Sequence, residues 1–510
     1  MPHLIMLFSN GLVFDGTGAE GRFGSVLIEK DRITAVDGAI NISDSLTVDC
    51  SGLAISPGFI DLHSHSDVQV LEHRTEKLRQ GVTTEVVGNC GFSPFPSGAD
   101  TKPLHDFAEG ILGRGGNWGW PSAASYFNAL SETSSRDYAL PLLGHGSLRV
   151  VVCGMRQGAV SSAELDHMSG LLEDSLDAGC AGFSTGLMYA PGSSAGPEEL
   201  EHFCRIVARK GKLYATHMRS YSDGLLDATR EQIQLAEKTG CRLQISHLQA
   251  AGRDNWHLQE PTLNEIEAAR GRGVDVEFDI YPYQCGSTVL TQLLPQWTLD
   301  GGSEALVDRL RDADTKSKIA DEMRTSGPKL WSDVTISSVE TLVNSALVGK
   351  TVDQIAAERG QVPEVCVLEL LLEEAGAVNI ISFNQSEANL RRLITHPLCS
   401  VITDGFYVKG KPHPRLHGTY PELLGKLVRD YRWLSLAEAI HKSTGKPAAR
   451  LNLVDRGVLK PGYKADLTIF DPAAIESHAT YEDPAQSPTG IRAVIKNGGV
   501  VFNSGMANLK

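Results

Sequence analysis

Residues 58–67 read GFIDLHSHSD, a short apolar run that ends abruptly in polar side chains. Apolar residues bounded by glycine and polar residues predict a buried β-strand. Seven later stretches have the same character: GVTTEVVGNCGF (81–92), YALPLLGHGSLR (138–149), CAGFSTGLMY (180–189), KLYATHMRS (212–220), RLQISHLQ (242–249), VDVEFDIYPY (274–283) and CSVITDG (399–405). The sequence therefore predicts eight buried strands.

Amphipathic helical patterns separate most of these strands. Three clear examples are AELDHMSGLLEDSLDAG (163–179), PEELEHFCRIVARKG (197–211) and LDATREQIQLAEKTG (226–240). Strands that alternate with helices form a parallel sheet, and eight such units are the count for a TIM-type barrel. We therefore predict an α/β fold with a (β/α)8 barrel. A doubly wound sheet is the alternative, and it would need fewer strands.

The two ends of the chain differ from the middle. Residues 1–55 and 451–510 contain short strands broken by turns and no clear helical pattern. Neither end has enough strands to be stable alone, so we predict that 1–55 and 451–510 together form a small β-sandwich domain. The metal-dependent barrel then occupies 56–450. The stretch 286–395 is too long for one crossover and contains its own helices, so it predicts a small inserted domain or lid between strands seven and eight.

Composition narrows the class of protein. The chain has 510 residues, of which 41% are apolar and 21% charged, so it can bury a large core. The net charge is −15 and no basic stripe appears, which argues against nucleic acid or an anionic membrane as partners. No apolar run reaches the ~18 residues of a membrane span. The first residues lack a basic leader, and the nine cysteines are odd in number, so we expect a soluble protein of the reducing cytoplasm.

Residues of the types that bind metal ions end five of the predicted strands. They are Asp61, His63 and His65 on the first strand, Cys90 on the second, His217 on the fifth, His247 on the sixth and Asp404 on the eighth. Each alone is ordinarily a core histidine, a buried cysteine or a turn aspartate. The carboxyl ends of barrel strands share one rim, however, and thiolate, neutral imidazole and carboxylate are ligands of zinc. Their joint placement therefore predicts a metal site.

The chain also resembles a known family. PGFIDLHSHSD (57–67) and KPGYKADLTIFDP (460–472) are similar to the first and last conserved segments of the amidohydrolase superfamily. Within it, GVTTEVVGNCGFSPFP, GFSTGLMYAPG, THMRSY, SHLQAAG, DIYPY, ITDG and HPRLHGTYPELLG resemble the D-aminoacylase family, the N-acyl-D-amino-acid deacylases. The likeness runs from about residue 5 to 500, and the motifs are specific only in combination.

The resemblance implies roles for the metal-type residues. It places one tightly held zinc ion on Cys90, His217 and His247, and a weak or empty second position on His63 and His65. Hydantoinases and dihydroorotases instead bridge two metals with a carbamylated lysine on the fourth strand, and GFSTGLMY has no lysine. Zinc would lower the pKa of water and polarise an amide carbonyl.

The remaining roles are also implied by the resemblance. Asp404 would take the proton from the attacking water and return it to the departing amine. Arg415 matches the arginine that binds the substrate carboxylate, while Tyr281 and Ser287 match substrate-contacting positions. Gln249 departs from the pattern, because the family commonly has lysine there, and this weakens the prediction of the preferred substrate.

A glycine-rich segment lies between the second and third predicted strands. GILGRGGNWGW (110–120) lacks the Lys-Ser/Thr of a phosphate-binding loop. We interpret it as a flexible loop over the active site, with Trp118 and Trp120 as pocket walls. His145 is a further candidate to face the pocket, and His413 is placed to shape the loop that carries Arg415.

These observations predict a zinc-dependent hydrolase that converts N-acyl-D-amino acids to a D-amino acid and a carboxylate. The D-preference rests wholly on the resemblance. One alternative is another amidohydrolase, acting on N-carbamoyl or cyclic amide substrates as hydantoinases and dihydroorotases do. A second is an inactive relative that serves as a scaffold, which the complete set of metal-type residues argues against. The sequence leaves the oligomeric state open.

Overall fold

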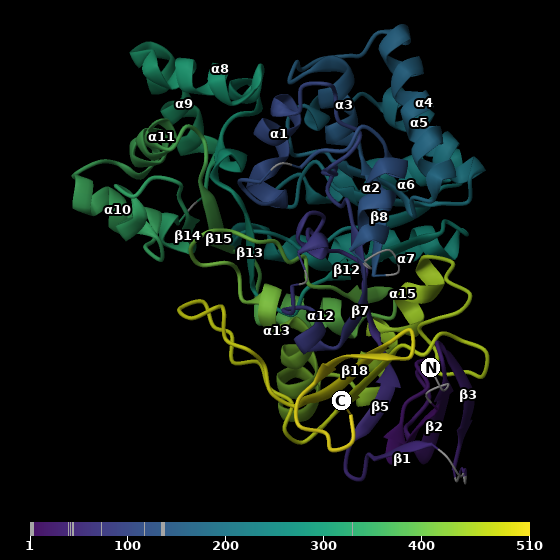
Figure 1. Ribbon diagram of the computed structural model, residues 1–510. Coiled ribbons are helices and arrows are strands. Elements are labelled where there is room, and N and C mark those ends of the chain that lie inside the picture. Colours follow the sequence, from purple (N-terminus) through teal and green to yellow (C-terminus); the bar gives the residue numbers. More distant parts are fainter. Residues whose placement is uncertain are drawn as a thin grey trace.

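All eight predicted barrel strands form, and they lie in one parallel sheet (Figure 1). In a computed structural model, residues 5–509 are described, apart from 39, 41, 43–44, 73, 117, 134–137 and 329. Asn117 of the glycine-rich segment thus lies outside the described residues. The barrel strands are β6 (Phe59–Asp61), β7 (Val82–Val87), β8 (Ala139–Gly144), β9 (Gly182–Gly186), β10 (Leu213–His217), β11 (Arg242–Ile245), β12 (Val276–Ile280) and β16 (Cys399–Val401).

The first and last barrel strands meet just beyond their carboxyl ends. Neighbouring strands pair in the order β6 to β12 and then β16. The backbone N–H of Asp404 donates to the carbonyl of His63 at 2.8 Å, and that of His65 donates to the carbonyl of Gly405 at 3.0 Å. The sheet therefore closes on itself. The prediction of a (β/α)8 barrel is confirmed, and the doubly wound alternative is wrong.

Helices cover the outside of the barrel because one face of each is apolar. In α5, residues 200, 203, 204 and 207 are buried, which is the spacing of one helical face. The helix α4 begins at a capping box in which Ser161 and Glu164 bond each other's backbone N–H groups. The barrel helices are α2 (Ala123–Glu132), α3 (His145–Cys153), α4 (Ser162–Ala178), α5 (Pro197–Arg209), α6 (Leu225–Thr239), α7 (Gln259–Gly271), α12 (Glu387–Thr395), α13 (Arg415–Pro421), α14 (Leu436–Ser443), α15 (Gly445–Arg450) and the π-helical segment η9 (Glu422–Asp430).

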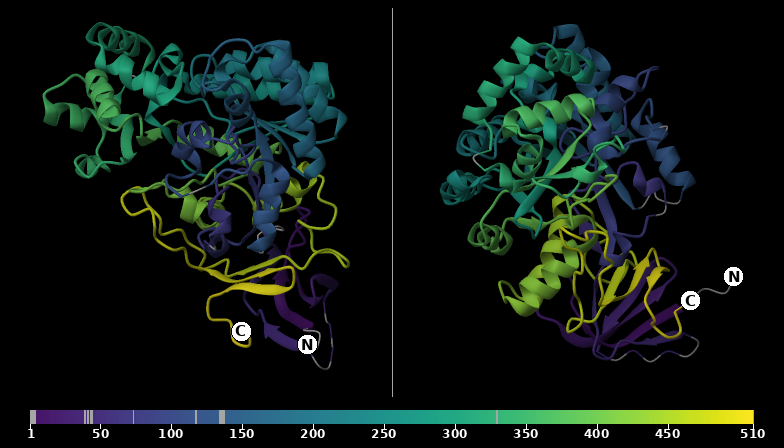
Figure 2. Two further views of the ribbon diagram at one scale, coloured as in Figure 1. Left: turned by 45° about the horizontal axis from the view of Figure 1, so that its top comes forward. Right: turned by 90° about the vertical axis from the view of Figure 1, so that its left-hand side faces the viewer.

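The long stretch between β12 and β16 forms its own sheet and core. Strands β13 (Cys285–Val289), β15 (Asn379–Phe383) and β14 (Val334–Ser338) pair antiparallel in that order. Four helices pack on them: α8 (Gly302–Arg311), α9 (Ala313–Ser326), α10 (Val352–Arg359) and α11 (Pro363–Glu373). Figure 2 shows this insertion standing beside the barrel. Helix α12 lies within the predicted range 286–395, yet its buried residues belong to the barrel core.

Strands from both chain ends share one further sheet. They are β1 (Ile5–Val13), β2 (Arg22–Glu29), β3 (Arg32–Asp37), β4 (Leu46–Asp49), β5 (Ala54–Pro57), β17 (Leu467–Phe470), β18 (Ile491–Lys496) and β19 (Gly499–Asn503). Pairing of β5 with β17 joins the amino-terminal strands to the carboxyl-terminal ones, and the purple and yellow strands lie side by side in Figure 2. Residues of both ends, such as Phe8, Val26 and Ile469, share a common core.

The remaining elements are short and lie in the connections. They are α1 (Lys102–Leu112) and the 3-10 turns η1 (Gln69–Leu71), η2 (Leu78–Gln80), η3 (Gly192–Ser194), η4 (Arg253–Leu258), η5 (Leu290–Leu293), η6 (Gln296–Leu299), η7 (Trp331–Asp333) and η8 (Ser345–Leu347). Among the described helices, none combines the length and the apolar character that a membrane crossing requires.

Candidate metal centre and active site

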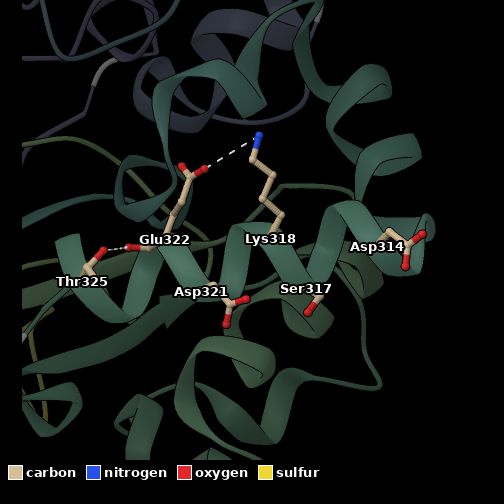
Figure 3. Close-up of a pocket in the computed structure, with 6 residues that line it drawn as sticks. All are labelled: Asp314, Ser317, Lys318, Asp321, Glu322 and Thr325. Carbon is tan, nitrogen blue, oxygen red and sulfur yellow. Dashed lines mark hydrogen bonds and ion pairs between the residues drawn. The ribbon is translucent and has the colours of Figure 1, made fainter.

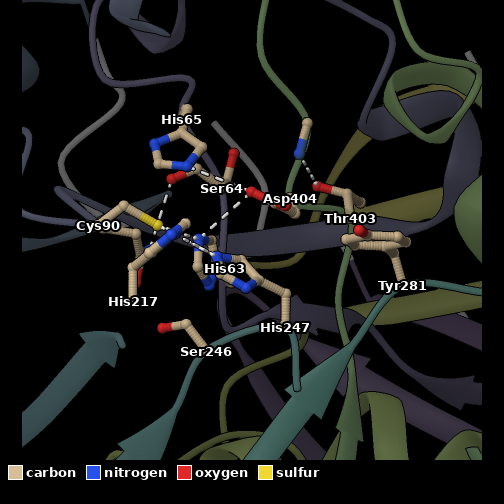
Figure 4. Close-up of polar contacts among 12 residues, drawn as sticks. His63, Ser64, His65, Cys90, His217, Ser246, His247, Tyr281, Thr403 and Asp404 are labelled. Carbon is tan, nitrogen blue, oxygen red and sulfur yellow. Dashed lines mark hydrogen bonds and ion pairs between the residues drawn. The ribbon is translucent and has the colours of Figure 1, made fainter. Parts of the chain in front are cut away.

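The predicted metal-binding side chains converge at the carboxyl rim of the barrel (Figure 4). The Cys90 sulfur lies 3.3 Å from Nε2 of His63 and 3.4 Å from Nε2 of His247. Nδ1 of His217 lies 3.1 Å from Nε2 of His247. Cys90 belongs to two groups whose potential ligand atoms all lie within 4.8 Å of one another, one with His217 and His247 and one with His63 and His65.

The backbone is constrained where these side chains emerge. Cys90, His247 and Asp404 have φ angles of +54°, +34° and +47°. Non-glycine residues rarely adopt this left-handed region, which costs of order 1–3 kcal/mol each and is found where the surrounding structure enforces it. The strand ends are thus bent so that these three side chains point at a common place.

The donor set fits zinc. The atoms that face one another are Nδ1 of His217, Nε2 of His247 and the sulfur of Cys90, which are all atoms that can bind zinc. Burial lowers the pKa of His247 to about 3 and that of His65 to about 4, so these imidazoles are neutral and able to donate a lone pair to a metal. One thiolate with two neutral imidazoles is an established zinc ligand set that leaves a fourth position open.

Asp279 on β12 supports this cluster, although it was not among the predicted site residues. Its Oδ1 accepts the backbone N–H of His247 at 2.7 Å and lies 3.6 Å from Nδ1 of His63. Its Oδ2 accepts a hydrogen bond from Gln244 at 2.7 Å. A carboxylate behind a histidine ligand fixes the ring orientation and tautomer. The sequence feature that could have identified Asp279 is an aspartate within VEFDI, a strand whose residues are almost all buried.

Asp404 lies between the histidine cluster and a buried cation. Its Oδ1 is 3.4 Å from Nε2 of His63 and 3.2 Å from Nε2 of His65, and its Oδ2 is 2.9 Å from Nη1 of Arg415. Burial alone would raise the pKa of Asp404, but Arg415, His63 and a hydrogen bond from His65 hold it well below its usual range. The carboxylate is therefore ionised.

Arg415 begins α13 and is 1% exposed. Its guanidinium carbon lies 4.5 Å from the ring centre of Tyr281, and its Nη2 donates to the carbonyl of Ser287 at 3.4 Å. The Nε of Arg415 is buried without a hydrogen-bond partner among the described residues. The side-chain amide of Gln249 donates to the Tyr281 hydroxyl at 3.2 Å. Arg415, Tyr281 and Gln249 thus form a continuous row beside Asp404.

Ser287 faces differently from the other predicted substrate-binding residues. Its hydroxyl donates to the carbonyl of Ile380 in the insertion at 2.8 Å. The antiparallel pairing of β13 with β15 directs the hydroxyl toward that neighbouring strand. Only its backbone carbonyl contacts Arg415.

The tryptophan and histidine candidates differ in position. Trp118 is buried in an apolar cluster that includes Cys90, Phe92 and Phe406. Trp120 is partly buried against the same cluster. His413 accepts the backbone N–H of Arg415 through Nδ1 at 3.0 Å and so shapes that loop.

His145 does not contact the row or the metal cluster. Its Nε2 lies 2.8 Å from Oε1 of Glu199, which also pairs with Arg149 at 2.7 Å. This buried triad connects α3 to α5.

A shallow hollow lies elsewhere, on the insertion (Figure 3). It runs along one face of α9 and contains none of the predicted site residues. Its lining is Asp314, Ser317, Lys318, Asp321, Glu322 and Thr325.

The chain is similar to known proteins over most of its length. The model of the Amidohydrolase family matches residues 46–502. D-aminoacylase of Alcaligenes xylosoxydans xylosoxydans is 34% identical over 501 residues, which cover 98% of this chain and 94% of that protein. N-acyl-D-aspartate deacylase of the same organism is 33% identical over 502 residues, which cover 98% of this chain and 92% of the relative.

A solved structure is similar over almost the whole chain. N-acyl-D-glutamate deacylase from Bordetella bronchiseptica, complexed with zinc and a phosphonate inhibitor that mimics the tetrahedral intermediate, has a TM-score of 0.84 and 31% identity. The similarity covers 99% of this chain and 98% of that one. Because the family model matches the whole barrel and part of the sheet of the chain ends, this chain belongs to the amidohydrolase family.

Proposed function

We propose that this protein is a zinc-dependent hydrolase that cleaves the amide bond of N-acyl-D-amino acids, giving a D-amino acid and a carboxylate. The observation that carries the proposal is the position of Asp404, within 3.4 Å of His63 and His65 and 2.9 Å from Arg415. A proton acceptor thus lies between a metal-type cluster and a cation that suits a substrate carboxylate. The D-preference is inferred from the relatives, whose names specify D-amino acids.

The metal would be held by Cys90, His217 and His247, with His63 and His65 forming a second and weaker position together with Cys90. When bound, zinc supplies a Lewis acid that lowers the pKa of water to near 7 and polarises the amide carbonyl.

Asp404 moves the proton in this proposal. As an ionised carboxylate, it accepts a proton from the attacking water. It then returns that proton to the nitrogen of the departing amine, which is otherwise a very poor leaving group. His63 and His65 hold Asp404 through their Nε2 atoms and so fix its orientation.

Arg415 binds the substrate carboxylate in this proposal. The guanidinium is planar and suited to a bidentate pair, and its Nε has no partner among the described residues. Tyr281 and Gln249 extend the same row and offer a hydroxyl and an amide for hydrogen bonding. Ser287 contributes through its carbonyl, which holds the guanidinium in place.

The structure argues against a hydantoinase-like alternative. Those enzymes bridge two metals with a lysine on the fourth strand, and here that strand, β9, reads GFSTG. A cysteine after the second strand lies in the metal-type cluster instead. The cytoplasmic location stays a prediction.

The test is an assay on matched N-acetyl-D- and N-acetyl-L-amino acids with bound zinc quantified by mass spectrometry. We expect turnover of the D series, with one tightly bound zinc per chain. Faster turnover of the L series would contradict the proposal. An Asp404→Asn variant, assayed beside it, guards against a contaminating hydrolase.

A further inference from the structure

A buried lysine that the proposed chemistry does not use lies beside the metal-type cluster. Lys77 precedes η2 on the connection from β6 to β7, and its side chain is 2% exposed. Its ammonium donates to Oδ2 of Asp61 at 2.6 Å, to Oγ of Ser64 at 3.2 Å and to the hydroxyl of Thr403. Oε2 of Glu85 lies 3.3 Å away. One cation thus has four polar neighbours.

These neighbours belong to β6, β7 and β16, the strands that lead to His63, His65, Cys90 and Asp404. Asp61 ends β6, and Ser64 stands between His63 and His65. Glu85 lies in β7, whose end leads to Cys90. Thr403 immediately precedes Asp404. Movement of the Lys77 ammonium would therefore be transmitted to both metal positions and to the proton acceptor.

The contacts also bridge the place where the barrel closes. In the described residues, β6 and β16 have no strand pairing of their own. Oδ1 of Asp61 accepts the backbone N–H of Thr403 at 2.9 Å, and Oδ2 accepts its hydroxyl at 2.5 Å. Lys77 binds the same Oδ2. Asp61 and Lys77 thus add side-chain bonds to the backbone bonds of His63, His65, Asp404 and Gly405 that close this seam.

Stability alone is a weak explanation for such a group. Two carboxylates and one ammonium are removed from water here, and well-packed apolar residues often stabilise a core as well as a buried ion pair does. Charged hydrogen bonds, in contrast, have narrow geometry and fix the positions of the atoms they join. Asp61 and Glu85 raise the pKa of Lys77 although burial opposes them, so the ammonium stays charged.

We propose that Lys77 is a positioning residue that holds the carboxyl ends of β6, β7 and β16 in register, so that His63, Cys90 and Asp404 meet at one centre. The inference rests on the proposed function for the identity of the metal ligands. It does not depend on which acyl amino acid is the substrate.

The test compares Lys77→Met with Lys442→Met in the full-length protein. Lys442 is also buried, and it donates to backbone carbonyls of His396 and Cys399, at the opposite end of β16 from Asp404. Both variants lose a buried cation, but only the first changes the seam. Each is titrated with Zn²⁺, and the absorption spectrum of the Co²⁺-substituted protein reports on the ligand geometry at Cys90.

We expect Lys77→Met to bind zinc about 10–100-fold more weakly, the range seen when groups behind metal ligands are removed. Its Co²⁺ spectrum should change, and kcat should fall by a similar factor with little change in KM. Lys442→Met should lower the melting temperature but keep zinc affinity, spectrum and kcat. A folded Lys77→Met protein with native zinc affinity and spectrum would overturn the proposal.

A second variant covers the case in which Lys77→Met does not fold. Lys77→Met combined with Glu85→Gln leaves one net negative charge, as in the native trio of Lys77, Asp61 and Glu85. It should fold and still show weakened zinc binding. Recovery of native zinc affinity in this double variant would show that charge balance, rather than position, is what Lys77 supplies. The metal titrations need no substrate, so they stand even where the D-amino-acid assay fails.

Discussion

Cys90 is the residue on which both candidate metal positions depend, because its sulfur belongs to both groups of potential ligands. Cys90→Ala should therefore lower bound zinc below one equivalent per chain, measured by mass spectrometry of the purified protein. Cys366→Ala is a matched control, since Cys366 is equally buried but lies in the core of the insertion. Stoichiometric zinc in Cys90→Ala would rule out this ligand assignment.

Replacing Asp404 should lower turnover without changing the amount of bound zinc. Removing its negative charge in Asp404→Asn takes away the proton acceptor while keeping the size of the side chain. We expect zinc to remain bound and kcat to fall by about 10²–10⁴, the usual contribution of a general acid–base group. The measurement is a steady-state assay with zinc determined in the same sample. A variant that keeps more than a tenth of the native kcat would assign the proton transfer to another group.

Gln249 should determine how the site treats a second carboxylate on the substrate. Its amide bonds the Tyr281 hydroxyl, and Arg415 lies over the Tyr281 ring, so a lysine at 249 would place a second cation in this row. We expect Gln249→Lys to raise kcat/KM for N-acetyl-D-glutamate relative to N-acetyl-D-leucine by about 10-fold, the effect of one charge-assisted hydrogen bond. Gln249→Met controls for size. An unchanged ratio would place Gln249 outside the substrate site.

Among the individual residues of the site, those at the ends of the barrel strands could be predicted from the sequence. Strand ends follow from local apolar patterns, so Cys90, His217 and His247 could be placed on one rim before any contact was known. Asp279 and Lys77 could not, because their roles depend on which strands become neighbours when the barrel closes. The direction of the Ser287 hydroxyl likewise follows from pairing with β15, some 93 residues away in sequence.

The alternation of strands and helices in the barrel could be predicted from the sequence. The pairing of strands that lie far apart in the chain could not. Each barrel strand from β6 to β11 pairs in parallel with the strand that follows it in sequence. Strand β12 pairs in parallel with β16, across the insertion. Within the insertion the sheet order is β13, β15, β14, which no local pattern indicates. The ends of the chain combine in one sheet because β5 and β17 pair across more than 400 residues. Such pairings depend on the packed core rather than on local propensity.

The stability of the insertion should depend on pH through one buried carboxylate, Glu374. Glu374, 3% exposed, accepts the backbone N–H groups of Glu340 and Thr341 at 2.7 and 2.9 Å and the Asn344 amide at 2.7 Å. Burial opposes ionisation, but hydrogen bonds from the Thr341 hydroxyl, the Asn344 amide and the two backbone N–H groups lower the pKa of Glu374. Its stabilising effect is therefore complete above the ordinary glutamate pKa of about 4.3 and is lost as pH falls through the lower folded value.

Glu374→Gln should accordingly destabilise the insertion at pH 7 and not at low pH. The measurement is urea unfolding of both proteins from pH 7 down to pH 3. We expect the difference in unfolding free energy to shrink as the pH falls below about 4.3. Glu358→Gln is the control, because Glu358 makes only an exposed pair with Lys350. A difference that is independent of pH would mean that the charge of Glu374 contributes nothing.

In the whole molecule, the barrel and the insertion are tied together near the active site by Glu340. Its carboxylate lies 3.4 Å from Nε of Arg114 and 2.9 Å from Nζ of Lys409. Arg114 belongs to the glycine-rich loop, and Lys409 follows Asp404 on the loop that leads to Arg415. Three segments that border the site therefore meet at one carboxylate. Asp404, the proton acceptor of the proposed reaction, is 6% exposed, so we expect substrate entry to depend on separation of these segments.

Glu340→Gln should make that separation easier. Partly exposed ion pairs contribute about 0–1 kcal/mol each, so loss of both should raise the open population by up to about 30-fold. Hydrogen exchange of residues 113–116 and 406–411 should speed up by that factor, while exchange in β9 and β10 stays the same. Because salt screens exposed pairs, the native protein in 1 M NaCl should approach the variant. Equal exchange in the two proteins at low salt would show that packing between the insertion and the barrel, rather than Glu340, controls access to the site.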